Sequence, residues 1–411
     1  MTVVMITHFM EEAAAADRVV VLDGGEIRMD GAPEEVLVRA DELRSLSLEV
    51  PFACRLARAA GRGRSRFHLH HRRHPEGGAM RLAFEDVSYS YEGGEAKKRR
   101  GRRKKDAARQ ADWGNAPDAV WALRDVTFTV EPGEFFGVAG HTGSGKSTLI
   151  QHMNGLVHPT CGRVLADGRD LAEKGVATEV RRQVGLVFQY PENQLFANTV
   201  YDDVAFGPRN MGLGAEEVDR RVREGLALVG LSFDELAERS PFDLSGGQQR
   251  RVAFAGVLAM EPEVLVLDEP VAGLDPLSRE EFLGLIRELH AGGRTIVMVS
   301  HSMEDLAALS DRILVLSEGR LFRLGTPAEV FADAAALKAV GLGAPAPEAF
   351  AASLREVGFT LGRDLYDERT LAADIAAQLE GAPAAAMLGA APDFAARQAA
   401  DAVAEGGDDD A

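Results

Sequence analysis

The run from Leu244 to Asp275 constrains the fold of this chain more than any other stretch. It joins the turn Leu244-Ser-Gly-Gly-Gln248, through an apolar stretch, to Val264-Leu-Val-Leu267, which two carboxylates, Asp268 and Glu269, follow. A short apolar run predicts a buried strand, and open α/β sheets bind ligands at the carboxyl ends of their strands. The Ser-Gly-Gly turn opens a predicted helix, where exposed backbone N–H groups suit an anion such as phosphate. The two features lie too close together for separate domains, so the run predicts one nucleotide-processing module.

A glycine-rich loop follows the apolar run Phe135–Ala139. It reads Gly140-His141-Thr142-Gly143-Ser144-Gly145-Lys146-Ser147-Thr148. It fits the pattern Gly-x-x-x-x-Gly-Lys-Ser, placed between a predicted strand and a predicted helix. The glycines let backbone N–H groups face phosphates, Lys146 adds positive charge at the β and γ oxygens, and the Ser147 hydroxyl suits magnesium. The loop therefore predicts binding of a nucleoside triphosphate.

Predicted strands and helices alternate around these motifs. Strands are expected in Leu82–Tyr91, which has period-2 alternation, and in Trp121–Val130, and a helix at Leu277–Ala291 precedes a strand at Thr295–Ser300. This alternation indicates an α/β fold with a largely parallel sheet covered by helices. No apolar run approaches the roughly 20 residues that a membrane-spanning helix needs, and the N-terminus lacks the sections of a signal peptide. Any membrane role is therefore expected to come through a partner.

The end of the module occurs twice in the sequence. The stretches Thr2–His8 and Asp17–Leu22 correspond, with one gap, to Thr295–His301 and Asp311–Leu316. Neither a phosphate loop nor a Ser-Gly-Gly turn precedes the N-terminal copy. We interpret residues 1–54 as the truncated tail of a first module. A strand, helix and hairpin alone leave an apolar face and open edges, so we expect residues 1–50 to pack poorly or to borrow a surface from the second module.

The chain divides by composition. Arginine and histidine dominate 55–79, which predicts a basic linker, and the complete module spans 80–335. Some helical periodicity marks 336–385, and the alanine-rich and acidic residues 386–411 predict a disordered tail. Two cysteines, Cys54 and Cys161, are too few for a disulfide framework or a metal site.

A basic block, Lys97–Lys105, lies within a predicted insertion at 92–116. A dense run of like charges repels itself and cannot pack, so it predicts a solvated loop, with anionic lipid headgroups as an alternative partner. The formal net charge of the whole chain is −18, which argues against general affinity for nucleic acid. No nucleic-acid partner is expected.

Together with His301, these motifs make the chain, from about Met80 to Val330, resemble the ATP-binding cassette ATPases. The resemblance implies a phosphate-loop (P-loop) cassette with a RecA-like core, an antiparallel β subdomain and a helical signature subdomain. It also implies ATP and Mg2+ as cofactors and ATP hydrolysis as the activity. Val271 departs from the family, which usually has threonine after Asp-Glu-Pro.

The resemblance also implies residue roles. Asp268, with Ser147 and Gln189, belongs to the magnesium site; Glu269 orients and deprotonates the attacking water. His301 contacts the γ-phosphate and that water, Lys146 acts with them in catalysis, and Gln189 couples the site to a partner. An aromatic side chain stacks on adenine, and we choose Tyr91 over Tyr89. The full nucleotide-binding set is Tyr91, Gly140, His141, Thr142, Gly143, Ser144, Gly145, Lys146, Ser147, Thr148, Ser245, Gly246, Gly247, Gln248 and Asp275.

The stretches Val187–Phe196 and Thr199–Gly212 narrow the resemblance. They are similar to the ATPase subunits of energy-coupling factor transporters, in the form of the second of that family's two paralogues, whereas the N-terminal repeat is more like the tail of the first. The implied partner is a transmembrane coupling subunit, received in a groove at about Gln189–Gly212 where Glu192, Asp202 and Asp203 offer carboxylates to arginines. A substrate-binding membrane subunit for vitamins or transition-metal ions is an indirect partner. The implied location is peripheral, on the cytoplasmic face of the cell membrane.

In this family the Ser-Gly-Gly turn completes the nucleotide site of an opposing cassette, and Asp275 lies on the dimer seam. The N-terminal repeat lacks both motifs, so the chain is expected to need a second full cassette. A separate first paralogue is the preferred partner, with a homodimer as the alternative, and 336–385 is the expected dimerisation region. The other functional interpretations are another ABC importer ATPase and a soluble two-cassette ATPase acting on nucleic acid or the ribosome, for which the basic block is the argument.

Overall fold

The computed structural model of the chain describes residues 4–7, 10–37, 39–46, 48, 80–91, 120–362 and 365–381. They fall into two units, one up to Ala346 and one from Pro347, and each is described by itself. The predicted basic linker at 55–79, the insertion at 92–116 and the tail at 386–411 lie outside the described residues. None of the helices in the described ranges has the length and apolar character to cross a bilayer.

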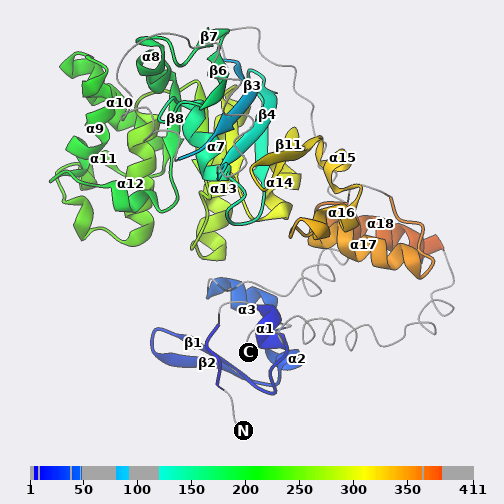
Figure 1. The fold of residues 1–411 in the computed structure, drawn as a ribbon. Helices are drawn as coiled ribbons and strands as arrows, with labels where there is room; N and C mark the ends of the chain where they lie inside the picture. The colour runs from blue at the N-terminus through cyan, green and yellow to red at the C-terminus, as the bar shows by residue number, and fades with distance from the viewer. Residues whose placement is uncertain are drawn as a thin grey trace, which may run out of the picture. The chain divides into compact units, whose positions relative to one another are not determined.

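A six-stranded sheet in the order β12-β11-β5-β10-β9-β8 forms the centre of the first unit (Figure 1). Its strands are β5 (Phe135–Ala139), β8 (Val184–Val187), β9 (Val264–Asp268), β10 (Thr295–Val299), β11 (Arg312–Ser317) and β12 (Arg320–Gly325). All pairs are parallel except β11 with β12. Every residue of β5, β9 and β10 is buried, as expected for strands covered on both faces. The predicted α/β class with a largely parallel sheet is confirmed.

Helices contact this sheet and connect its strands. They are α7 (Lys146–Met153), α8 (Val176–Gln183), α13 (Pro276–Ala291) and α14 (Met303–Leu309). α7 contacts β9, α8 contacts β8, and α14 contacts β5. The helix and strand expected at Leu277–Ala291 and Thr295–Ser300 are observed with ends shifted by one residue.

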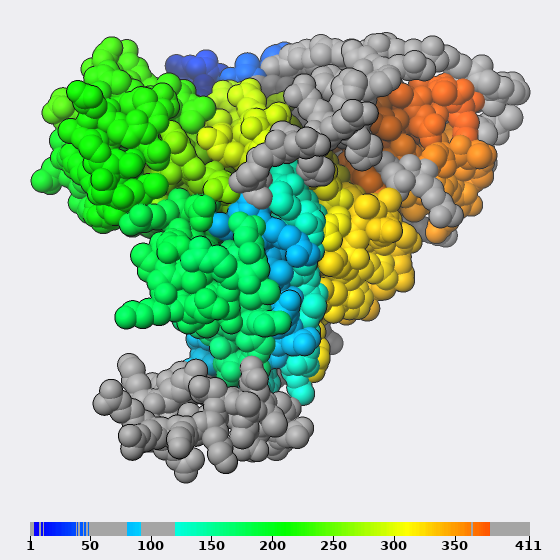
Figure 2. Space-filling view, turned by 90° about the horizontal axis from the view of Figure 1, so that it is seen from above, coloured from blue at the N-terminus to red at the C-terminus, as the bar shows by residue number. Residues whose placement is uncertain are grey.

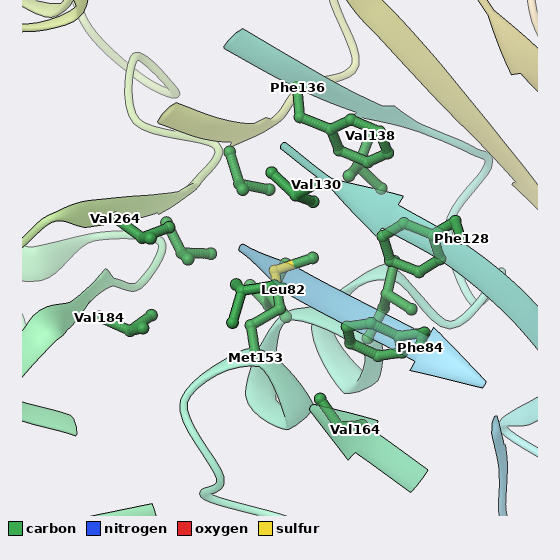
Figure 3. Close-up of a cluster of buried hydrophobic side chains, with 14 of the residues drawn as sticks. Leu82, Phe84, Phe128, Val130, Phe136, Val138, Met153, Val164, Val184 and Val264 are labelled. Atoms are coloured by element: carbon green, nitrogen blue, oxygen red, sulfur yellow. The ribbon is translucent and has the colours of Figure 1, made fainter. Parts of the chain in front are cut away.

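A second, antiparallel sheet in the order β4-β3-β6-β7 belongs to the same unit. Its strands are β3 (Leu82–Tyr89), β4 (Leu123–Val130), β6 (Cys161–Ala166) and β7 (Arg169–Asp170). One hydrophobic cluster joins this sheet, α7 and the central sheet (Figure 3). Within it the rings of Phe84, Phe128 and Phe136 stack in series, with centroid separations of 4.5 and 5.4 Å. This shared core ties the antiparallel sheet to the strand that precedes the phosphate loop.

A helical lobe is inserted between β8 and β9. It contains α9 (Val200–Asn210), α10 (Ala215–Leu228), α11 (Phe233–Leu236) and α12 (Gly246–Leu258), with short 3-10 turns η1 (Pro191–Gln194) and η2 (Pro241–Asp243). α9, α10 and α12 pack on one another, and the space-filling view shows them in green on one side of the sheets (Figure 2). With the two sheets, this lobe completes the predicted cassette architecture.

Two short helices, α15 (Pro327–Phe331) and α16 (Ala334–Ala339), follow β12 in the first unit. The second unit has α17 (Ala346–Glu356) and α18 (Glu368–Gly381) around a small core of Ala351, Leu361, Leu365 and Leu371. The boundary between the two units falls at Ala346.

The N-terminal repeat forms the same hairpin as its later copy. Strand β1 (Val19–Asp23) pairs with β2 (Glu26–Gly31), Val19 opposite Gly31, with a register shift after Val21. In the later copy Ile313 lies opposite Gly325, and the shift follows Val315, the counterpart of Val21. α1 (Met10–Ala14) precedes the first hairpin, and α2 (Pro33–Val36) and α3 (Ala40–Ser45) follow it. The two sequence copies thus adopt one local structure.

The surroundings of the two hairpins differ. β11 pairs with β5 on its other edge, whereas β1 and β2 form a two-stranded sheet of their own. Leu316 is fully buried, but its counterpart Leu22 is 67% exposed, and Val20 and Ile27 on the same hairpin are also exposed. The first hairpin therefore leaves open the apolar face that the second one buries. The expectation that residues 1–50 pack poorly or borrow a surface from the second module stays a prediction.

We expect the paired substitutions Leu316→Ala and Leu22→Ala to differ sharply in their effect on stability. Leu316→Ala leaves a cavity in the shared core and should lower the free energy of unfolding by about 2–5 kcal/mol. Leu22→Ala removes an exposed side chain at the equivalent position and should change it by less than about 0.5 kcal/mol. Denaturant unfolding of the full chain, followed by circular dichroism, measures both. Equal effects would show that the N-terminal hairpin is buried to the same extent as its copy.

Candidate functional site

The site lies where the parallel strands end. Val138 of β5 pairs with Val299 of β10, and Val299 pairs with Asp268 of β9. On the other side of β9, Leu267 pairs with Val187 of β8. Because these registers align the carboxyl ends, the residues just after the strands meet at one edge of the sheet. Those residues are Gly140, Gln189, Glu269 and His301.

The phosphate loop connects β5 to α7. Gly145 has a φ of 104°, and a Cβ there would lie 2.4 Å from the Ala122 carbonyl oxygen, so a larger residue does not fit. Lys146 Nζ donates to the carbonyl oxygens of Gly140 (2.6 Å) and His141 (3.0 Å), which folds its side chain back across the loop. Burial lowers the pKa of Lys146, while Glu269 and Asp268 act in the opposite direction. The loop therefore presents backbone N–H groups and a partly buried ammonium at the start of α7.

Two carboxylates face this ammonium. Asp268 ends β9, is 8% exposed and accepts a hydrogen bond from Ser147. Burial raises its pKa, which Lys146 and Ser147 partly offset. Burial also raises the pKa of Glu269, to about 7, against the opposing effects of the His301 backbone N–H and Lys146. A carboxylate with a pKa near neutrality is suited to accept a proton.

His301 lies beside Glu269. Its backbone N–H donates to Glu269 Oε2 at 3.3 Å. Its ring Nε2 is 3.3 Å from Glu269 Oε1, but Oε1 has no hydrogen-bond partner, so the contact lacks hydrogen-bond geometry. Burial and the charge of Lys146 lower the pKa of His301, and the imidazole is therefore neutral at pH 7. The unpaired, buried Oε1 is an acceptor available to a substrate or water.

The residues at this edge fit a magnesium ion. Ser147 and Asp268 supply a hydroxyl and a carboxylate oxygen in contact with each other, and such hard oxygen donors are what Mg2+ prefers. Gln189 is exposed just after β8. In the described part of the chain no group of three or more His, Cys, Asp or Glu side chains forms a metal cluster. Magnesium sites at nucleotides need only one or two carboxylates, because phosphates and waters complete the shell.

The two candidate aromatic residues differ in their surroundings. Tyr91 is 59% exposed, and its hydroxyl lies 2.8 Å from Thr148 Oγ1 at the start of α7. Tyr89 is partly buried and packs edge-on against His152, with a centroid distance of 5.0 Å. Tyr91 is therefore the more exposed of the two near the phosphate loop, and its ring meets that of Tyr89 edge-on at 5.0 Å. Its role in stacking on adenine remains a prediction.

The Ser-Gly-Gly turn Ser245–Gln248, called the signature turn from here on, caps one helix, and Asp275 caps another. Ser245 and Gln248 form a capping box at the start of α12, and Gly246 and Gly247 are exposed there. Asp275 caps α13 by accepting from the backbone N–H groups of Leu277 and Ser278. Among the hydrogen bonds of the described residues, none joins this turn or Asp275 to the phosphate loop. The structure thus brings together the loop, Asp268, Glu269 and His301, and leaves Ser245–Gln248 and Asp275 accessible in this single chain.

The carboxylates expected to meet a partner's arginines already have partners in this chain. Asp202 binds Arg209 at 2.9 Å, and Asp203 accepts from the backbone N–H groups of Phe196 and Ala197. Glu192 receives two hydrogen bonds from Arg250, at 2.9 and 3.0 Å. The contact of these carboxylates with arginines of a coupling subunit stays a prediction.

Sequence reasoning did not identify Arg250. It lies on α12 with a side chain that is 6% exposed, on the same helix face as the buried Phe254 and Leu258. The signal was available, because positions i, i+4 and i+8 of a helix share a face and a buried arginine requires a partner. Identifying Glu192 as that partner required the fold, since 58 residues separate the two.

The chain is similar to known proteins in both sequence and structure. The family model described as "ABC transporter" matches residues 123–272. The protein named "Energy-coupling factor transporter ATP-binding protein EcfA2" of Symbiobacterium thermophilum is 52% identical over 303 residues, which are 74% of this chain and 98% of that protein. The protein of the same name from Clostridium tetani is 51% identical over 60% of this chain and 86% of its own length. The solved structure of cbiO1 from Clostridium perfringens, described as part of the ABC transporter complex cbiONQ, is 35% identical with a TM-score of 0.51, covering 64% of this chain and 95% of that one.

We expect Tyr91→Ala to weaken binding of a non-hydrolysable ATP analogue by about 5- to 150-fold, the loss of about 1–3 kcal/mol of base stacking. Tyr91→Phe keeps the ring and loses only the contact with Thr148, so its affinity should stay within about tenfold of the wild type. Isothermal titration calorimetry measures both. Unchanged affinity in Tyr91→Ala would remove this residue from the nucleotide site.

Proposed function

This chain belongs to the energy-coupling factor transporter ATP-binding proteins, and we propose that it hydrolyses ATP to power import of a micronutrient, a vitamin or a transition-metal ion, through such a transporter. Family membership rests on 52% identity to a relative that is matched over 98% of its length. The observation that carries the activity is the meeting of the phosphate loop, Asp268, Glu269 and His301 at one edge of the sheet.

The geometry supports the following division of roles. Backbone N–H groups of Gly143–Thr148 and the ammonium of Lys146 bind the phosphates. Ser147 and Asp268 would hold Mg2+, with Gln189 as a further ligand, and the ion would supply positive charge beside the phosphate oxygens. Glu269 accepts a proton from the attacking water, for which its pKa near 7 is suited. His301, neutral and next to Glu269, orients the water and the γ-phosphate.

A second cassette is part of the proposal. Ser245, Gly246, Gly247 and Asp275 are exposed, and neither they nor Gln248 are hydrogen-bonded to the chain's own phosphate loop, which suits contact with nucleotide on an opposing subunit. We assign the separate first paralogue as that subunit, forming a heterodimer, with a homodimer as the outcome to test against it. Residues 336–385 are assigned to stabilise the pair.

The proposed docking site for the transmembrane coupling subunit is the aromatic surface of the segment 189–212. Tyr190, Phe196 and Phe206 are 44%, 59% and 49% exposed, and the rings of Phe196 and Phe206 meet edge-on at 4.9 Å. Exposed aromatic residues are enriched at protein interfaces. The chain is thereby held peripherally at the cytoplasmic face of the membrane, and the substrate-binding subunit contacts it only through the coupling subunit.

We expect Glu269→Gln to bind ATP normally and to lower kcat for hydrolysis by a factor on the order of 10² or more, because the general base is lost. The matched control is Glu288→Gln, an exposed carboxylate on α13, which should leave kcat unchanged. Phosphate release measures turnover, and equilibrium binding measures affinity. Turnover by Glu269→Gln close to that of the wild type would exclude Glu269 as the base.

We expect Phe206→Glu to reduce co-purification with the membrane proteins encoded by neighbouring genes, by about tenfold or more, because a central interface aromatic is worth about 2 kcal/mol or more. Binding of ATP by the isolated chain should not change, since Phe206 lies outside the nucleotide site. Leu156→Glu is the control, because Leu156 is equally exposed, at 49%, outside the proposed surface. Equal recovery of both variants would contradict the assignment.

A further inference from the structure

Among the described lysines and arginines outside the nucleotide site, Arg250 is the most deeply buried. It lies at the second turn of α12 and is 5% exposed. Its Nε and Nη2 donate to the two carboxylate oxygens of Glu192, at 3.0 and 2.9 Å. Its Nη1 donates to the carbonyl oxygen of Ala272 at 2.7 Å. A single guanidinium therefore binds two loops and fixes both of them to α12.

The first of these loops belongs to the proposed docking segment. Glu192 lies in η1, three residues after Gln189, and η1 packs on α12. Burial raises the pKa of Glu192, but the hydrogen bonds from Arg250 outweigh this and hold the pKa below its ordinary value. Glu192 is therefore ionised at neutral pH, and its pairing with Arg250 is a charge-assisted, bidentate contact.

The second loop leads from the general base to the dimer-facing residue. Ala272 lies between Glu269 and Asp275, and its backbone N–H donates to the carbonyl oxygen of Glu269 at 3.1 Å. The Tyr190 ring passes close to Gly273 of this loop, and the Arg250 guanidinium lies 5.8 Å from the same ring. The docking segment and the loop after Glu269 are thus joined both directly and through Arg250.

We propose that Arg250 is a positioning residue that transmits the placement of the docking segment to the loop carrying Glu269 and Asp275. The inference rests on the proposed function, because it assumes that a partner binds at 189–212 and that Glu269 is the base. A rigid, planar guanidinium suits this role, because its fixed fork holds Glu192 and the Ala272 carbonyl at a set separation. Lysine has no such fork, so the link depends on arginine and not only on positive charge.

The test uses the complex purified with the membrane proteins of the neighbouring genes. Arg250→Ala leaves the partly buried carboxylate of Glu192 without its arginine and is expected to destabilise the fold. The informative variant is the double substitution Arg250→Leu/Glu192→Leu, which removes both charges together and replaces them with apolar side chains. Arg250→Lys tests for partial rescue. Arg251→Gln is the matched control, because Arg251 also binds a carboxylate, that of Glu281, and a backbone carbonyl, that of Val229, at the adjacent position of α12.

We expect the double-leucine variant to assemble and to keep KM for ATP within about twofold, while kcat of the complex falls about tenfold, the pattern of an interaction used in turnover and not in binding. Arg250→Lys should give an intermediate kcat, and Arg251→Gln should match the wild type. A wild-type kcat in the double-leucine variant would overturn this inference and leave the proposed function standing. A loss of kcat in Arg251→Gln equal to the loss in the double-leucine variant would do the same. Absence of ATP hydrolysis by the wild-type complex would overturn the proposed function, and the inference with it.

Discussion

The parallel pairing of β5, β10 and β9 aligns three buried strands so that their carboxyl ends meet. This alignment places Asp268 and Glu269 at a partly dehydrated edge, where burial raises the pKa of both. Lys146, which follows the phosphate loop after β5, is a cation that opposes the cost of burying these two carboxylates. Buried carboxylates are stabilised by added positive charge, so the same edge that is costly without a ligand favours a metal-bound nucleotide.

Much of this arrangement could be predicted from the sequence. The phosphate loop and the carboxylates follow apolar runs of strand length, so their local context and their common edge follow from the parallel α/β class. The role of the signature turn stays a prediction. Contacts between loops could not be predicted in this way. Glu192 was assigned to an external arginine, because its sequence context shows a carboxylate on a loop and nothing about Arg250 58 residues later.

The two hairpins show which part of a fold local sequence determines. β1–β2 and β11–β12 share the same pairing and the same bulge, so turn residues and strand pattern are sufficient for the hairpin itself. The burial of each hairpin is determined by the elements around it. In the cassette, the carbonyl oxygen of Gly319 accepts a hydrogen bond from the backbone N–H of Arg124 in β4, and the N–H of Gly319 donates to the carbonyl oxygen of Ser144 in the phosphate loop. At the N-terminal turn, a Cβ on Gly24 or Gly25 would meet nothing within 4 Å. Repetition of a sequence therefore repeats local structure and not tertiary packing.

The pair of buried Arg250 and partly buried Glu192 is difficult to explain by stability alone. Removing two charges from water costs several kcal/mol, and well-packed apolar residues in place of a buried ion pair are often as stable or more so. The pair nevertheless joins a helix to two loops. A hydrophobic contact would allow these loops to slide, because it has no preferred direction. Three directed hydrogen bonds from one guanidinium fix their separation, and this is the property required of a link between a docking surface and a catalytic loop.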